Sequence, residues 1–327
     1  MISQKKYDIC GWIGVARRDT SAICLAMKKI ETFADLVAQL SARHESKRIA
    51  VVCPYDESTI GAVAMALKRN AARFVLLGTA ARLAVLPAEW ATRPDVEILE
   101  TATDADAAQA ATAMARNGEA DVVMKGLIGT DTLLKAVLNK ETGILPAGNV
   151  LTHLAVAQLP GYHKLIFVSD VAVIPYPTLA QREAILRYDL ATCRRLGIEH
   201  PNVALIHFTE KVNPKFPNST DYVSLIEKAK AGAFGNVEMG GPMDVKTACD
   251  AHSAQIKGIE SPVCGNADLL MFPNIESGNT FYKTITVFAG AVIAGMLQGA
   301  MVPVVLPSRS DSAESKFYSL VMAVLTA

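Results

Sequence analysis

The feature that most constrains the fold of this 327-residue chain is a repeated alternation of short apolar runs with helical patterns. Four apolar runs of strand length lie at 49–53, 74–78, 96–99 and 121–125, and helical patterns occur among them at 60–67 and 104–117. Such runs are typical of buried parallel strands, and their alternation with helices favours a parallel α/β sheet over a sandwich. In these sheets, ligands bind beyond the carboxyl ends of the strands.

The alternation resumes after residue 152. Further strands are expected at 165–170, 203–208 and 267–272, with helices at 181–196 and 220–231. The segment 280–299 is apolar and contains spaced glycines, and it is expected to form a helix that leads to a final strand at Pro303. The length of the chain favours two domains.

Polar residues directly follow several predicted strands, at Asp56, Lys125 and Ser308–Arg309. The segment 303–318 breaks at Pro307 from an apolar run into polar residues and then into a helical pattern. The N–H groups at such a helix start favour an anion. The alternative is structural: Ser308 or Ser310 caps the helix.

Two other features allow both a functional and a structural interpretation. Lys125, Gly126 and Thr130 lie in a glycine-containing segment that follows a predicted strand and lacks the spacing of a Walker loop. The glycines either let the backbone approach a phosphate closely or form an ordinary turn. His153 follows a turn, where it could contact a ligand or cap a helix.

Composition excludes several classes of function. The 32 basic residues balance the 32 acidic ones, so no net charge favours nucleic acid or an anionic membrane. The six cysteines show no metal-ligand spacing, so zinc is not expected. Cys53 and Cys249 lie in apolar contexts typical of reduced core residues, which indicates a cytoplasmic protein. No apolar run is long enough to span a membrane. Residues 1–26 are expected to be an upstream extension with little defined structure.

Four separated stretches together resemble the phosphate acetyl/butyryltransferase family. They lie at 124–143, 160–170, 265–283 and 303–318. Their order and spacing are most similar to the phosphate butyryltransferase branch, and the likeness runs from about Met27 onward. The most specific part is the Gly278-Asn279 pair followed by Tyr-Lys283, with Ser308-Arg309 about 25 residues later.

The resemblance implies reversible transfer of a short, butyryl-like acyl group between coenzyme A and inorganic phosphate, without a metal, a permanently bound cofactor or a covalent acyl-enzyme. It also implies two α/β domains of the isocitrate/isopropylmalate-dehydrogenase-like type, with the active site in the cleft between them. The first domain would comprise 27–148 plus 300–327, and the second 149–299. The family likeness further implies a homodimer.

The resemblance also implies roles for particular residues. Arg309 offers a planar fork for phosphate oxygens, and Ser308 with nearby N–H groups would stabilise an oxyanion. In the acetyl branch an acid lies at the offset that Ser315 occupies here, so the residue that exchanges a proton with the thiol would be Asp311 or Glu314 instead. Of these two, Asp311 is slightly favoured. The expected substrate-binding residues are Lys125, Gly126, Thr130, Lys135, His153, Asn274, Gly278, Asn279 and Lys283.

The sequence departs from the family pattern at Asn266, at Lys135, where an arginine is usual, and at Lys246, where an acid is usual, with Asp244 two residues earlier. These departures keep two alternatives open: a phosphate acetyltransferase, or a non-catalytic paralogue that binds coenzyme A. A dehydrogenase on the related fold would need metal-binding carboxylates, and the sequence offers no convincing set.

Overall fold

The computed structural model describes residues 30–43 and 46–327, so the predicted extension at 1–26 lies outside the described residues. The strands are β1 (Arg48–Val52), β2 (Arg73–Gly78), β3 (Val96–Glu100), β4 (Val122–Lys125), β5 (Thr152–Gln158), β6 (Ile166–Ser169), β7 (Asn202–Ile206), β8 (Glu238–Met243), β9 (Leu269–Met271), β10 (Val292–Gln298) and β11 (Val304–Val305). The helices are α1 (Phe33–Ser41), α2 (Glu57–Leu67), α3 (Ala80–Leu83), α4 (Asp104–Arg116), α5 (Thr130–Val137), α6 (Leu179–Arg195), α7 (Pro217–Lys230), α8 (Val245–Cys249), α9 (Ala251–Ile256), α10 (Ile275–Phe288) and α11 (Ala313–Thr326), and a 3-10 turn spans Ala88–Thr92.

All of these strands form one sheet in the order β3-β2-β1-β4-β11-β10-β5-β6-β9-β7-β8. The two flanks, β3 to β11 and β6 to β8, are parallel, as the alternating pattern predicts. The centre is not: β10 runs antiparallel to β11 and β5, and β5 runs antiparallel to β6. Short connections without a crossover helix join β5 to β6 and β10 to β11, and such connections produce antiparallel pairs, whereas β5 and β10 pair although they lie far apart in the sequence.

The expected helix at 280–299 is wrong in its second half. Helix α10 ends at Phe288, and β10 begins four residues later. Gly290, at φ +63°, adopts the left-handed conformation that ends helices. Strand β10 then pairs with β5 along its whole length, from Val292 opposite Gln158 to Gln298 opposite Thr152. An apolar run of this kind suits either a helix or a buried strand, and here the neighbouring strand decides.

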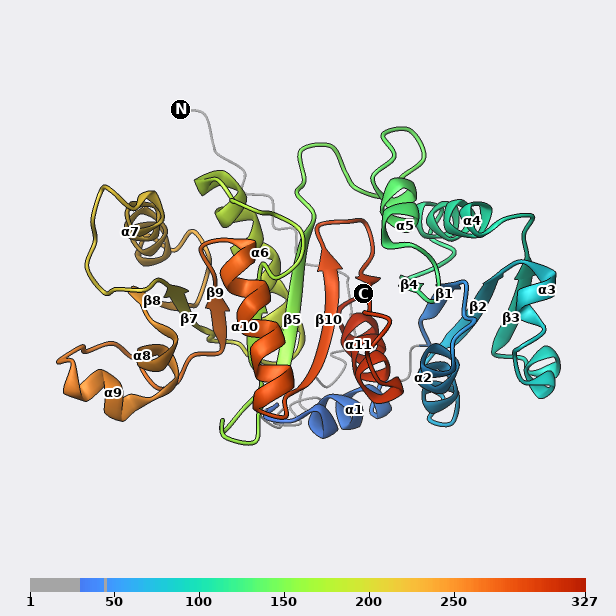
Figure 1. Ribbon diagram of the computed structural model, residues 1–327, viewed down its shortest axis with the longest axis horizontal. Coiled ribbons are helices and arrows are strands. Elements are labelled where there is room, and N and C mark those ends of the chain that lie inside the picture. The colour runs from blue at the N-terminus through green and yellow to red at the C-terminus, as the bar shows by residue number, and fades with distance from the viewer. Residues whose placement is uncertain (1–29, 44–45) are drawn as a thin grey trace, which may run out of the picture.

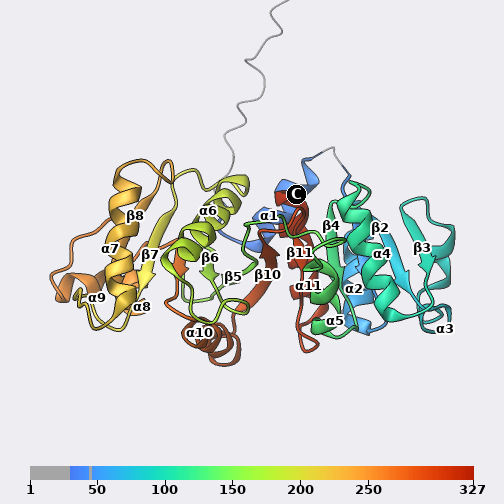
Figure 2. The ribbon, with the colours of Figure 1, turned by 90° about the horizontal axis from the view of Figure 1, so that it is seen from above.

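Helices cover both faces of the sheet (Figures 1 and 2). One apolar core joins α1, α2, α6 and α11 to one face along both flanks. The opposite face is covered by α4 and α5 on one flank and by α8 and α10 on the other. Figure 1 shows β5 and β10 near the middle of the long axis, with β7 and β8 toward one end and β2 and β3 toward the other. The sheet centre is therefore where the two flanks meet.

Candidate active site

Three adjacent parallel strands bring the predicted polar residues to one edge of the sheet. Lys125 pairs with Val52 near the end of β1, and Val305 of β11 pairs with Met124 of β4. Asp56 and Ser308 follow these strand ends within a few residues. The prediction that polar groups gather at the carboxyl ends of these strands is confirmed.

The turn after β11 is organised by Asp311. Its Oδ2 accepts a hydrogen bond from the Ser308 backbone N–H at 2.8 Å, and the Asp311 N–H donates to the Ser308 carbonyl at 3.2 Å. The N-cap of α11 is Ser312, whose hydroxyl accepts from the Ser315 N–H at 3.1 Å. The interpretation of Ser308 or Ser310 as the cap is therefore wrong. Among the described residues, the Ser308 hydroxyl contacts only Ser310, through the Ser310 hydroxyl at 3.1 Å and the Ser310 N–H at 3.5 Å.

A cavity of about 170 Å³, the central cavity, lies beside this turn. Six predicted site residues line it: Thr130, His153, Asn279, Lys283, Ser308 and Asp311. They come from both flanks and from the sheet centre, although they are far apart in the sequence. The remaining wall consists of residues that the sequence did not single out: Val171, Ala172, Tyr282, Ile293, Ala294, Gly295, Leu306, Pro307 and Ser319.

His153 belongs to β5, so the alternative of a helix cap is wrong. Its ring lies against Gly295, where an added Cβ would stand 2.8 Å from His153 Cε1. Burial lowers the pKa of His153 to about 4, against the opposing charge of Asp170, and Lys283 lowers it further. The imidazole is therefore neutral at neutral pH, and Lys283 contributes the positive charge on this side of the cavity.

Helix α10 supplies one wall of the central cavity. Asn279 Nδ2 donates to the Val171 carbonyl at 2.9 Å, and the Lys283 ammonium lies 4.5 Å from the ring centroid of Tyr282. Burial raises the pKa of Tyr282 to about 12. Asn274 is outside the cavity and caps the helix, since its Oδ1 accepts from the Ser277 N–H at 2.9 Å.

The loop after β6 is fixed by two features, one of which is its close contact with α10. Gly278 allows close approach, because a Cβ there would lie 2.5 Å from the Asp170 carbonyl oxygen. The Asp170 carboxylate accepts from the N–H groups of the three residues 172–174 at 2.8 to 3.0 Å. Asp170 thereby fixes the segment that presents Val171 and Ala172 to the cavity. Sequence reasoning did not assign it, although it ends one of the four resembling stretches.

Arg309 faces a neighbouring space, the outer cavity, of about 540 Å³. Its lining comprises Asp56, Glu57, Ser58, Gly61, Arg309, Asp311 and Ala313. Asp311 lines both cavities, so this residue stands at the boundary between the Ser308 side and the Arg309 side.

Two buried lysines lie close to the outer cavity. Lys316 Nζ contacts Asp56 Oδ1 at 2.8 Å and Thr59 Oγ1 at 3.0 Å. Lys125 Nζ donates only to the Gly126 carbonyl, at 3.3 Å, among the described residues, and burial lowers its pKa, helped by the charges of Lys316 and Arg309. Sequence reasoning missed Lys316; the signal was a lysine directly before the apolar face of the final helix.

Three other predicted residues are not brought to the central cavity. Lys135 lines a separate space between α4 and α5. Glu314 accepts a hydrogen bond from the Tyr318 hydroxyl at 2.9 Å and lines neither the central nor the outer cavity. Gly126 packs against the chain after β1, since an added Cβ would lie 2.3 Å from the Cys53 carbonyl oxygen.

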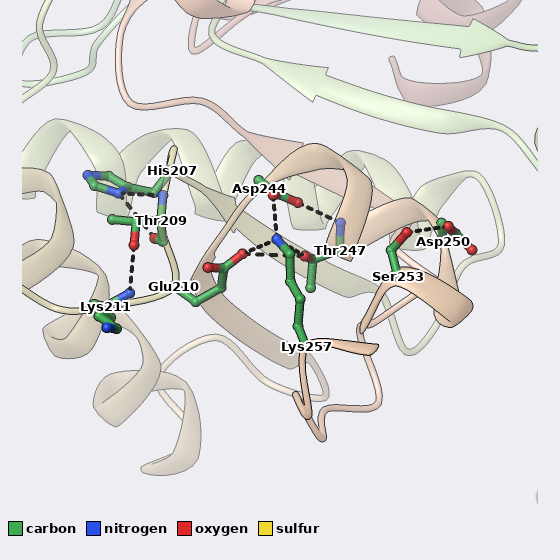
Figure 3. Close-up of polar contacts among 9 residues, drawn as sticks. All are labelled: His207, Thr209, Glu210, Lys211, Asp244, Thr247, Asp250, Ser253 and Lys257. Atoms are coloured by element: carbon green, nitrogen blue, oxygen red, sulfur yellow. Dashed lines mark hydrogen bonds and ion pairs between the residues drawn. The ribbon is translucent and has the colours of Figure 1, made fainter. Parts of the chain in front are cut away.

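Asp244, two residues before the departure at Lys246, has a structural role (Figure 3). Asp244 caps α8 by accepting from the Thr247 N–H at 2.7 Å. Lys257 joins Asp244 at 2.6 Å to Glu210 at 2.5 Å, which ties the loop after β7 to the start of α8. This polar cluster lines none of the cavities above. Within residues 30–43 and 46–327, no cluster of three His, Cys, Asp or Glu could hold a metal, and no helix could cross a membrane.

Comparisons with known proteins agree with this geometry. Residues 88–324 match the model of a family described as phosphate acetyl/butaryl transferase. The chain is 37% identical over 290 residues to a probable phosphate butyryltransferase of Bacillus subtilis, covering 89% of this chain and 96% of that protein. It is 35% identical over 299 residues to the phosphate butyryltransferase of Clostridium acetobutylicum, covering 91% and 99%.

A solved structure is similar over most of its length. The branched-chain phosphotransacylase from Enterococcus faecalis superimposes with a TM-score of 0.76 at 30% identity, covering 86% of this chain and 98% of that chain. The expected α/β fold is confirmed by this likeness. Sequence and structure together show that the chain belongs to the phosphate acetyl/butyryltransferase family.

Proposed function

We propose that this protein transfers a short acyl group, butyryl by preference, directly between coenzyme A and inorganic phosphate within a ternary complex. The observation that carries the proposal is the central cavity, which gathers six predicted site residues around an apolar wall. Val171, Ile293 and Leu306 give that wall the character suited to a short acyl chain. Butyryl rather than acetyl preference is supported by the names of the two relatives compared above.

In this mechanism, Arg309 binds phosphate through its planar guanidinium beside the turn. A phosphate oxygen attacks the thioester carbonyl carbon, and the Ser308 hydroxyl donates to the oxyanion that develops. The carbon–sulfur bond then breaks and coenzyme A leaves as a thiolate, which takes up the proton that the attacking phosphate loses, passed on by Asp311. In the reverse direction, Asp311 accepts the thiol proton. Asp311 lines both the central and the outer cavity, whereas Glu314 lines neither, which supports Asp311 rather than Glu314 as the proton acceptor.

The proposal includes the domain division at 27–148 plus 300–327 and 149–299. The sheet order supports it, because the first segment supplies β1 to β4 and β11, and the second supplies β5 to β10. It also includes a homodimer, for which Val287 and Phe288, 72% and 84% exposed at the end of α10, offer an apolar contact. A cytoplasmic location fits the free thiols of the buried Cys53 and Cys193.

The test is release of coenzyme A from acetyl-, butyryl- and hexanoyl-CoA, with and without phosphate. We expect phosphate-dependent release, fastest with butyryl-CoA. Arg309→Ala should lower kcat/KM by about a hundredfold or more, and Arg309→Lys should recover only part of it. Arg73→Ala, an exposed arginine on β2, is the matched control. Release that is independent of phosphate, or unaffected by Arg309→Ala, would contradict the proposal.

The dimer has its own measurement. Light scattering of the full chain should give twice the monomer mass, and the double variant V287D/F288D should give a monomer. A wild-type monomer at assay concentrations would contradict this part and leave the proposed reaction untouched.

A further inference from the structure

Another cavity lies at the opposite ends of the central strands from the central cavity. This amino-end cavity has a volume of about 460 Å³ and lies where the start of β4 meets the connection from β10 to β11. Asp121 contributes from the first flank, Thr192 and Arg195 from α6, and Gln298 from the end of β10. It shares no lining residue with the central or outer cavity, so it is a separate site.

Buried polar atoms without partners mark this cavity as more than a packing gap. Gln298 is 7% exposed, and its Nε2 donates to Thr192 Oγ1 at 2.5 Å. Its Oε1 has no hydrogen-bond partner among residues 30–43 and 46–327. Exchanging the amide oxygen and nitrogen would only move the deficit to the other atom. An unpaired buried amide is costly, so a ligand that donates to it would bind favourably.

Thr152 does not line the cavity itself, but it carries a second unpaired group beside Gln298, at the same level of the sheet. It is fully buried, and its Oγ1 also has no partner in the described part of the chain. Thr152 and Gln298 stand directly opposite one another in the β5–β10 ladder, and opposed residues of an antiparallel pair project on the same face.

Arg195 gives the amino-end cavity a positive charge, while the acidic Asp121 on the opposite side is paired with Lys47 at 3.4 Å and with the Arg48 N–H at 2.8 Å. Arg195 is exposed on α6, and one guanidinium nitrogen donates to the Thr326 carbonyl. The other guanidinium nitrogens have no partner among the residues that the structure describes, and they offer the fork that binds a carboxylate. Ala115, Ala191 and Met301 supply apolar surface. Together these groups match a short organic carboxylate that also carries a hydroxyl or amino donor.

We propose that the amino-end cavity is an effector site for such a hydroxy- or amino-carboxylate. Two elements connect it to the central cavity. Strand β10 lines the central cavity through residues 293–295 and the amino-end cavity through 296–298. Helix α11 does the same through Ser319 and Thr326. A ligand held between α6 and β10 therefore acts on the elements that shape the central cavity.

Binding is tested by calorimetry and ligand-observed NMR on the full chain. The probes are lactate, 3-hydroxybutyrate and valine, with butyrate as the control that lacks the donor. At least one probe should bind more tightly than butyrate and remain bound in the presence of saturating coenzyme A. Arg195→Met and Gln298→Leu should each raise its Kd about tenfold or more. Arg187→Met is the matched control, since Arg187 lies on the same helix and also donates to a backbone carbonyl.

Absence of binding by all three probes up to about 10 mM would overturn the site. So would a Kd that neither variant changes, or displacement of the probe by coenzyme A. The effector role rests on the proposed function and has a separate measurement: a bound probe should change the KM for acyl-CoA at least twofold in the wild type and not in Arg195→Met. If a probe binds but leaves the KM unchanged, the effector role is overturned and the binding site stands. If the enzyme is inactive, the binding measurements alone decide whether the site exists.

Discussion

Removing the Asp56 carboxylate should destabilise the fold far more than removing the ammonium group that it pairs with. The Lys316 side chain is 2% exposed, whereas that of Asp56 is 21% exposed and also accepts from Thr59 and Ser58. Asp56→Ala leaves a buried, uncompensated ammonium, which costs about 3–5 kcal/mol. It also removes the N-cap of α2, which costs about 1 kcal/mol. The expected loss is therefore about 4–6 kcal/mol.

Lys316→Met should cost much less, about 1–2 kcal/mol, because methionine fills similar space and Asp56 keeps water and two hydroxyl donors. Urea unfolding of both variants and of the double variant measures these values. The double variant should be more stable than the sum of the single losses predicts, since removing Lys316 also removes the unpaired charge. Lys47→Met, in a half-exposed pair with Asp121 at 3.4 Å, is the control and should cost about 1 kcal/mol or less.

The same pair predicts a dependence on pH. Burial alone would raise the pKa of Asp56, but hydrogen bonds from Lys316, Thr59 and Ser58 outweigh it and hold the pKa well below its ordinary value. A carboxyl whose pKa is lower in the folded than in the unfolded state stabilises the fold, and this stabilisation is complete above the unfolded pKa of about 4. It is lost as the pH falls from about 4 toward the folded-state pKa. Wild type should lose stability below pH 4 more steeply than Lys316→Met. Equal losses in Asp56→Ala and Lys316→Met, both below about 1 kcal/mol, would refute the reasoning.

Three further outcomes follow from the site. Asp311→Asn should lower the rate of acyl-CoA formation by about a hundredfold, whereas Glu314→Gln should change it by less than about threefold; equal effects in steady-state assays would argue against Asp311 as the base. Gly126→Ala should destabilise the fold by about 2 kcal/mol or more, because its Cβ would lie 2.3 Å from a carbonyl oxygen just after β1. Gly161→Ala, with nothing within 4 Å, is its control, and equal melting temperatures would contradict the clash. The His153 Cε1 proton shift should stay constant from pH 8 to about 5, since the pKa is about 4; an NMR midpoint near 6.5 would contradict its burial as a neutral ring.

The parallel flanks could be predicted from sequence because their strands are short apolar runs bounded by helical patterns. The polar residues at their carboxyl ends followed from the same rule. Strand β10 could not be predicted, because Val292–Gln298 is apolar enough for either a helix or a strand, and its pairing partner β5 lies more than 130 residues earlier. Local pattern carries no information about such a partner.

The residues of the site could be predicted only in part, again because the sequence does not show which distant segments pack together. Lys135 and Lys283 are both lysines on helices, and only packing places Lys283 in the central cavity and Lys135 in another. Ser308 and Ser312 are both plausible caps by residue type, and the Asp311 turn decides between them. Asp170 and Lys316 act through contacts with distant elements, and these contacts depend on the folded chain.

Strand β11 has only two residues, yet it lies between β4 and β10, and the α11 that follows packs on α1, α2 and β10. The flank built from residues 48–125 therefore reaches its final packing only when residues 304–326 join it. On the ribosome, β1, β4 and α2 emerge long before this last segment is synthesised, and their apolar surface stays uncovered until then. Such distant pairing slows folding. We therefore expect nascent chains that stop before residue 304 to bind chaperones and to be cut readily by proteases.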